Sequence, residues 1–273
     1  MKNMLSVVSW TRKLIVGSLI LATTWVTWDN WGRFSFLSDA PQIEAIDTPT
    51  PHTLAQGEYL VRISGCVACH TNNGGEPLAG GRRIDTPFGP VFSSNLTPSP
   101  THGIGAWTFA NFQTALRWGR SRDGRLLLPA FPYNHTSVFT VNDMHAMFAW
   151  LQSIKPIDIE RPAHQLTWPV GTQPVIAVWR SLYFSPTPFK SNEHESDAWN
   201  RGAYLVQSAG HCAACHGQRN VLGSFPKVDD LSGGFLPSQM WVAPSLVASP
   251  QTTLARSSTQ DIEQLLRAGQ NST

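Results

Sequence analysis

Charged residues and cysteines are both scarce in this chain of 273 residues. Asp, Glu, Lys and Arg make up 14% of it, against roughly 25% in an average soluble domain, and the formal net charge is +2. There is no run of basic residues, so the sequence offers no electrostatic footprint for nucleic acid and we expect no nucleic-acid partner. Also missing are G-x-S-x-G, H-E-x-x-H and a dinucleotide glycine fingerprint. The chain alone is therefore not predicted to be an enzyme.

The four cysteines stand in two C-x-x-C-H motifs, GCVACH at 65–70 and HCAACH at 211–216. Zinc sites take four ligands whose paired halves lie close in sequence, whereas these pairs are far apart. A redox dithiol needs a βαβ context and no histidine. Covalent haem uses all three residues, two as thioethers and the histidine as an iron ligand. Zinc and redox chemistry remain as minor alternatives.

The sequence therefore predicts two molecules of covalently attached haem c. The expected thioether anchors are Cys66, Cys69, Cys212 and Cys215, and the expected axial iron ligands are His70 and His216.

The chain around the two motifs repeats itself. GEYLVRISGCVACH at 57–70 parallels GAYLVQSAGHCAACH at 202–216, and SSNLTPSP at 93–100 parallels APSLVASP at 243–250. ALRWGRS and LLRAGQN follow at the same spacing. An internal repeat of this kind predicts two similar domains in tandem.

Helical spacing of apolar residues predicts helices over 54–63, over 108–119 with Gly119 as a stop, and over 141–154. No alternating β-branched run is found, so we expect a mostly α fold with long loops. The expected segments are a linker (31–53), a first unit (54–154), a proline-rich connector that packs on the surface (155–198) and a second unit (199–273).

Residues 1–30 resemble a secretory signal or membrane anchor. Lys2, Arg12 and Lys13 precede the apolar run 14–26, which is the pattern of an export signal. An A-x-A cleavage site is absent, and Trp25 and its neighbours suit a membrane interface. The run is short for a span, which needs about 20 apolar residues. We expect an uncleaved anchor that holds the protein on the periplasmic side of the bacterial inner membrane.

From about Leu54 onward the chain resembles the cytochrome c subunit of bacterial membrane-bound dehydrogenases. The resemblance rests on GEYLVRISGCVACHT, on PLAGGRRIDTPFGPVFSSNLTPSP with the segment after it, on LLPAFPY, and on WNRGAYLVQSAGHCAACHGQ. It implies two class I-like cytochrome c domains and an electron-transfer role. A catalytic dehydrogenase subunit, acting on alcohol, sorbitol, gluconate or aldehyde, would supply electrons, and membrane ubiquinone or a terminal oxidase would accept them.

Two departures from the family bear on the haem sites. Members usually carry three motifs and continue beyond LLRAGQNST with a ligand loop and a closing helix, so the second domain is expected to be incomplete, with the apolar side of 202–206 and the distal haem face exposed. Some relatives read PAMPY, with a methionine ligand, where this chain reads PAFPY at Phe131.

The remaining candidate ligands are interpreted as core, packing or solvated residues. Met144 and Met147 lie on the apolar stripe of the helix over 141–154 and are expected in the core. His135 is expected to be a solvated loop residue, and Met240 a packing residue. The alternative function is that of a dihaem cytochrome c peroxidase, which the missing methionine at Phe131 favours and the run of dehydrogenase-type motifs opposes.

Overall fold

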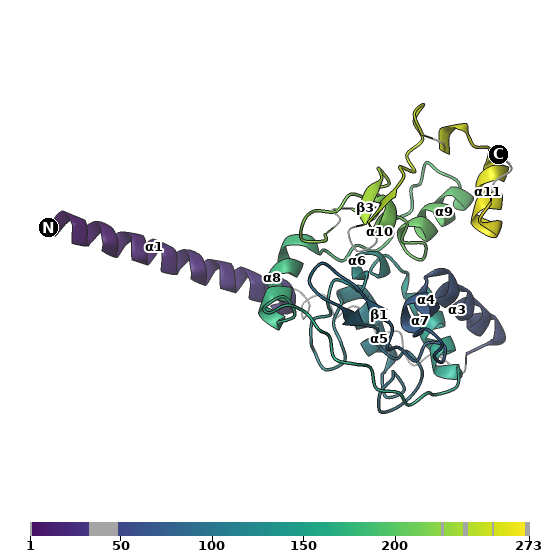
Figure 1. Ribbon diagram of the computed structural model, residues 1–273, viewed down its shortest axis with the longest axis horizontal. Helices are drawn as coiled ribbons and strands as arrows, with labels where there is room; N and C mark the ends of the chain where they lie inside the picture. The colour runs from purple at the N-terminus through teal and green to yellow at the C-terminus, as the bar shows by residue number, and fades with distance from the viewer. Residues whose placement is uncertain (1, 33–48, 225–226, 237–239, 253, 271–273) are drawn as a thin grey trace.

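The computed structural model describes residues 2–32, 49–224, 227–236, 240–252 and 254–270. Most of the expected linker, 31–53, lies outside them. The mostly α class is confirmed (Figure 1). The helices of the first unit are α3 (Pro51–Ile63), α4 (Cys66–His70), α5 (Phe109–Trp118), α6 (Tyr133–Thr136) and α7 (Val141–Ser153). Those that follow are α8 (Gln173–Tyr183), α9 (Asp197–Gln207), α10 (Ala213–His216), the 3-10 turn η2 (Leu254–Arg256) and α11 (Thr259–Ala268).

Capping explains why α5 begins and ends where the sequence predicts. The backbone N–H of Asn111 donates to Thr108 Oγ1 (3.2 Å), and Asn111 Oδ1 accepts from the Thr108 N–H (3.1 Å). This capping box satisfies donors that the first helical turn leaves unpaired. Gly119 ends the helix at φ 54°, a left-handed conformation that glycine adopts without a Cβ penalty. In the second unit α11 has the same devices at Ser258 and Gly269.

The core of the first unit forms where α3 crosses α7. Leu60 and Val61 of α3 are fully buried against this crossing. Gly57 makes the close approach possible, because a Cβ there would lie 2.0 Å from the carbonyl oxygen of Ala146 in α7. Phe112 of α5 completes the layer by packing on Phe148 of α7, with ring centroids 5.3 Å apart.

Two short antiparallel ladders, which the sequence did not predict, follow the two motifs. β1 (Arg83–Ile84) pairs with β2 (Val91–Phe92), and β3 (Gly234–Leu236) pairs with β4 (Trp241–Ala243). Strands of two or three residues are too short to show a period, so alternation in the sequence could not reveal them. The segment that follows the second strand of each ladder faces the C-x-x-C-H motif of the same unit.

The N-terminal segment forms helix α1 (Lys2–Thr27), which continues into a π-helical turn, η1 (Trp28–Gly32). Figure 1 shows α1 extending away from the rest of the molecule. Among the described residues, no helix combines the length and the apolar character that crossing a membrane requires. The membrane anchor expected over 1–30 has no support from this helix.

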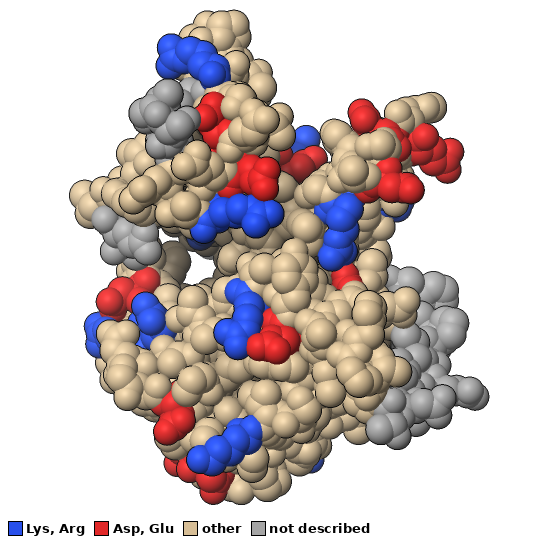
Figure 2. Space-filling view, turned by 90° about the vertical axis from the view of Figure 1, so that its right-hand side faces the viewer, with Lys and Arg blue, Asp and Glu red and all other residues tan. Residues whose placement is uncertain are grey.

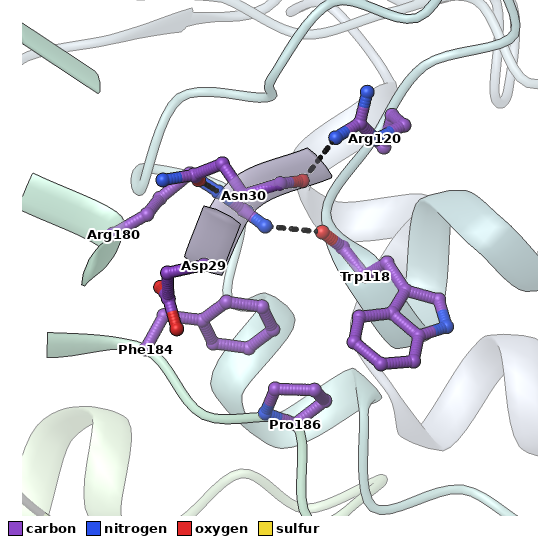
Figure 3. Close-up of a pocket in the computed structure, with 7 residues that line it drawn as sticks. All are labelled: Asp29, Asn30, Trp118, Arg120, Arg180, Phe184 and Pro186. Carbon is purple, nitrogen blue, oxygen red and sulfur yellow. Dashed lines mark hydrogen bonds between the residues drawn. The ribbon is translucent and has the colours of Figure 1, made fainter. Parts of the chain in front are cut away.

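The end of this segment is held in the body of the protein by Asn30, which is 3% exposed. Its Nδ2 donates to the carbonyl oxygen of Ala177 in α8 (3.0 Å) and to Ser181 Oγ (2.8 Å). Its Oδ1 accepts from Arg180 Nε (3.1 Å), and its carbonyl oxygen accepts from Arg120 (Figure 3). The residues that follow the apolar run are therefore part of the fold, and they pack against the connector helix α8.

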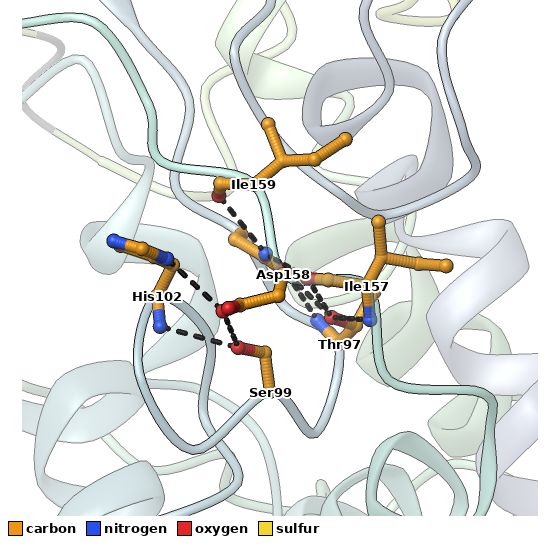
Figure 4. A network of polar contacts seen from close by, with 7 residues as sticks. Thr97, Ser99, His102, Ile157, Asp158 and Ile159 are labelled. Atoms are coloured by element: carbon orange, nitrogen blue, oxygen red, sulfur yellow. Dashed lines mark hydrogen bonds and ion pairs between the residues drawn. The ribbon is translucent and has the colours of Figure 1, made fainter.

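A polar network ties the start of the connector to the first unit. Asn95 is buried; its Nδ2 donates to the carbonyl oxygens of Ile157 (2.7 Å) and Ile159 (3.2 Å), and its Oδ1 accepts from Thr97 (Figure 4). Because buried amides need partners on both atoms, this arrangement fixes the path of the connector along the 95–99 loop.

The second unit inserts a side chain into the core of the first. Tyr204 of α9 is 4% exposed and packs with the first-unit core, whereas its equivalent in α3, Tyr59, is 47% exposed. The Tyr204 hydroxyl donates to Asp143 Oδ2 (2.5 Å), and Asp143 Oδ1 accepts from Gln56 Nε2 (2.5 Å). The face of 202–206 that was expected to be exposed is therefore partly buried at Tyr204. A Cβ on Gly202, by contrast, would have no neighbour within 4 Å.

Candidate haem-attachment sites

Each C-x-x-C-H motif forms one short helical turn. Cys66 and Cys69 lie in α4, and the turn from Cys212 through α10 carries Cys215. Residues three apart in a helix share a face, so the two thiols of each motif lie on one side of their turn. All four cysteines are free thiols. Two free thiols on one side of a turn are the arrangement that thioether attachment to the two vinyl groups of one porphyrin requires.

The two motif histidines are oriented in the same way. His70 Nδ1 lies 2.6 Å from the carbonyl oxygen of Ser94, and His216 Nδ1 lies 2.7 Å from that of Pro244. Ser94 and Pro244 occupy matching positions in SSNLTPSP and APSLVASP. A histidine whose Nδ1–H donates to a backbone carbonyl has its tautomer fixed and its Nε2 available to a metal.

Glycines bring the facing loop onto each histidine. The Gly80 N–H donates to the carbonyl oxygen of His70 (2.7 Å), and the Gly233 N–H donates to that of His216 (2.7 Å). Both glycines have positive φ, 76° and 97°. A Cβ on Gly80 would lie 2.5 Å from the carbonyl carbon of Ser94, so a larger residue would push away the carbonyl that orients His70.

The environment of the first motif is apolar. Burial raises the pKa of the Cys66 thiol to about 12 and lowers the pKa of His70 below its ordinary value. A neutral imidazole is the form that binds a metal. Cys66 and Val67 of this motif pack on the first-unit core, as does Phe131.

A cavity of about 610 Å³ opens directly after the second motif. Its volume falls within the range of roughly 300–1,000 Å³ that is usual for cofactor sites. Residues of β3 and β4, with Pro244 that orients His216, form one wall. The lining includes Gln218, Arg219, Gly233, Phe235, Val242 and Pro244.

Of the other candidate ligands, two methionines lie where the sequence predicts, whereas a histidine and a third methionine do not. Met144 and Met147 are in the core, as predicted, with 0% and 2% exposure. His135 was expected to be solvated, which is wrong: it is fully buried in α6, with Nδ1 2.8 Å from the carbonyl oxygen of Gln207. Met240 was expected to pack, which is also wrong, since it is 78% exposed and has a φ of 51°. Both residues lie in loops or short turns, where periodicity carries no information about burial.

A serine, a histidine and an aspartate do meet at the connector, but not as a nucleophile site. Ser99 Oγ donates to Asp158 Oδ1 (2.7 Å), and His102 Nδ1 lies 3.0 Å from the same oxygen (Figure 4). In a catalytic triad the serine hydroxyl faces a ring nitrogen of the histidine instead. Within the described ranges, no group of three or more His, Cys, Asp or Glu residues could hold a metal ion.

Charged residues are sparse on one face of the molecule. On the face shown in Figure 2, Lys and Arg residues stand in small groups among Asp and Glu, with wide uncharged areas between them. No extended basic patch is visible on that face.

No family model matches the chain. It is, however, similar to several curated proteins. It is 43% identical over 198 residues (71% of this chain, 16% of the other) to a component of the nicotinate dehydrogenase of Pseudomonas putida. It is 38% identical over 245 residues (86% and 52%) to the cytochrome c subunit of the quinone-type alcohol dehydrogenase of Gluconacetobacter polyoxogenes. A diheme cytochrome c-type protein of Cereibacter sphaeroides matches at 33% over 197 residues (70% and 66%).

The chain thus spans about half the length of the alcohol dehydrogenase subunit that it matches. Other similar proteins are the cytochrome subunits of fructose and gluconate dehydrogenases. The matching names agree with the resemblance carried by the repeated motifs. The chain belongs to the family of cytochrome c subunits of bacterial dehydrogenases.

Proposed function

We propose that the chain carries two c-type haems and is an electron-transfer subunit of a dehydrogenase. The observation that carries this proposal is the matched orientation of His70 and His216, each with Nδ1 on the carbonyl of an equivalent loop. Both motifs fit the group, because two thiols on one face precede an imidazole with an available Nε2. When bound, haem supplies a one-electron couple at its iron.

The residues of the chain then have separate roles. Cys66, Cys69, Cys212 and Cys215 would hold the two porphyrins as thioethers, and His70 and His216 would ligate the irons. Ser94 and Pro244 orient the imidazoles through their carbonyl oxygens. The apolar side chains around the first motif exclude water, and the exposure of a haem site is one of the factors that set its reduction potential.

The haem count is tested by mass and haem staining of the denatured protein, made in a host that matures cytochromes c. We expect two covalent haems in the unaltered chain, one after Cys66→Ala with Cys69→Ala, and one after Cys212→Ala with Cys215→Ala. The two double variants serve as matched controls for each other. Loss of both haems from either variant, or fewer than two in the unaltered chain, would contradict the proposal.

The proposed electron donor is a catalytic dehydrogenase subunit, and the proposed acceptor is ubiquinone or a terminal oxidase of the respiratory chain. The names of the similar proteins support a dehydrogenase partner. Covalent haem is attached outside the cytoplasm, which supports a periplasmic location. Ser99, His102 and Asp158 do not form a nucleophile site, so their meeting at the connector gives no reason to assign a catalytic role.

Mixing experiments test the partner. The purified holoprotein alone should not be reduced by alcohols, sugars, aldehydes or nicotinate, and should be reduced when a cognate dehydrogenase subunit is added with its substrate. Substrate-dependent reduction of the isolated chain would overturn the assignment as a non-catalytic subunit.

A dihaem peroxidase is the alternative, and Phe131 is the observation that favours it. Phenylalanine cannot ligate iron, and Phe131 packs on the first-unit core at the position where the family resemblance implies a methionine in some members. A peroxidase would consume hydrogen peroxide with a reduced cytochrome as electron donor. Turnover no faster than that of free haem would exclude this alternative.

A further inference from the structure

The residue directly before each first cysteine has an unusual backbone. Gly65 precedes Cys66 and His211 precedes Cys212, so the two residues are equivalent in the repeat. Both lie in the left-handed region, with φ of 65° and 37°. Glycine adopts this conformation at no steric cost, but for histidine it is uncommon. Such outliers persist only where surrounding structure holds them, and they cluster at functional sites.

The His211 ring reaches the equivalent residue of the other unit. Its Cε1 lies 3.8 Å, and its Nε2 4.0 Å, from the position that a Cβ on Gly65 would occupy. These are ordinary van der Waals separations. The two attachment loops therefore meet at matching positions, each one residue before the first cysteine of its motif.

A buried histidine supports the other side of this contact. His135 of α6 packs edge-on against His211, with ring centroids 6.2 Å apart and planes at 81°. Its Nδ1 lies 2.8 Å from the carbonyl oxygen of Gln207, at the end of α9. Burial lowers the pKa of His135 to about 4, so its ring is neutral near pH 7 and does not repel its neighbour.

The segment between Gln207 and His211 is seated on the first unit as well. Ala209 is 1% exposed and belongs to the first-unit core. The Cys212 N–H donates to the carbonyl oxygen of Val206 (3.2 Å), which joins the second motif to α9. The second attachment loop is thus held by the first unit and not only by the connector.

We infer that His211 is a positioning residue that holds the two haem-attachment loops against each other, so that the two haems are neighbours at a fixed spacing. The inference rests on the proposed function for the presence of both haems. The spacing would be set by the contact of His211 with Gly65 and His135. It would not depend on the length or the motion of the connector.

The test uses the holoprotein and the variant His211→Gly. Glycine is the residue that the first unit has at this position, so it suits the left-handed backbone while removing the ring. Two neighbouring porphyrins couple their Soret transitions and give a bisignate signal in circular dichroism beyond the sum of the signals of the two separate haems. We expect this signal in the unaltered protein and a loss of amplitude in His211→Gly. His211→Asn should show the same loss, because asparagine tolerates a positive φ without supplying a ring.

The matched control is His194→Gly, which removes an exposed imidazole from a turn before α9 and should leave the signal unchanged. Haem staining separates the two levels of the argument. Fewer than two haems in the unaltered chain would refute the proposed function. Two haems with no bisignate signal, or an equal signal in His211→Gly and the unaltered protein, would refute the role of His211. If His211→Gly fails to mature, His211→Asn decides by the same comparison.

Discussion

Replacing Gly57 with alanine is expected to destabilise the protein at the crossing of α3 and α7. The added Cβ would stand 2.0 Å from the carbonyl oxygen of Ala146 and 2.9 Å from Trp150 Cβ. The first of these neighbours is backbone, so it cannot move aside as a flexible side chain could. The two helices would have to separate, and Leu60 and Val61, now fully buried, would lose contacts with α7.

The magnitude follows from two opposing effects. Overpacking a well-packed core costs about 1–3 kcal/mol, sometimes more. Alanine has a higher helix propensity than glycine, by up to about 1 kcal/mol. We expect a net loss of about 1–2 kcal/mol in the free energy of unfolding, which for a protein of this size lowers Tm by about 2–4 °C per kcal/mol. Thermal unfolding of the holoprotein, followed by circular dichroism at the helical band, measures it.

Gly202→Ala is the matched control, because Gly202 is the equivalent residue of α9 and a Cβ there meets nothing within 4 Å. Only the propensity effect applies, so this variant should be more stable by about 0.5–1 kcal/mol. Opposite signs for the two alanines would support the packing described for α3 and α7. A Gly57→Ala protein as stable as Gly202→Ala would refute the reasoning.

Three further perturbations follow from buried polar groups. Asn30→Ala removes an amide that bonds to α8 and Arg180, and should cost about 1–3 kcal/mol in a denaturant titration; equal stability would show that η1 is not held there. Tyr204→Phe leaves Asp143 without its hydroxyl donor and should lower stability by about 1–2 kcal/mol, with unchanged haem content. Burial lowers the pKa of His135 to about 4, whereas in the unfolded chain it is about 6.5. Between these two values the unfolded chain binds more protons than the folded protein. The contribution of His135 to stability is therefore complete above about pH 6.5 and falls as the pH is lowered through this window. His135→Gln should flatten this dependence, and an unaltered slope would contradict it.

The elements that periodic patterns control were predictable from the sequence. The helix expected over 108–119, with its stop at Gly119, agrees with α5 (Phe109–Trp118), and the expected helix over 141–154 agrees with α7 (Val141–Ser153). Helix α3 begins earlier than expected, at Pro51, because Thr50 caps it through its side chain. The haem-attachment motifs were readable because their chemistry needs fixed residue types at fixed spacing.

The long-range polar contacts were not predictable. No local sequence pattern indicates that the amide of Asn30 forms hydrogen bonds with α8, because the partners are about 150 positions away in the chain. The burial of His135 depends on Gln207 and His211 of the second unit, and so on the way the two units meet. Tyr59 and Tyr204 are equivalent in the repeat, but the first is exposed and the second, on the side expected to be exposed, is buried. Symmetry in a sequence does not extend to residues at the junction between its copies.

The placement of Tyr204 and Ala209 in the first-unit core bears on how the chain could be dissected. A fragment cut within the connector would carry a complete first motif, yet it would have a gap where these two side chains belong. Phe139, which packs on the Tyr204 ring, would lose that contact. The smallest autonomous piece that contains Cys66 therefore extends past residue 209, almost to the second motif. The two copies of the repeat are separate segments of the sequence, but the first copy is not a folding unit by itself.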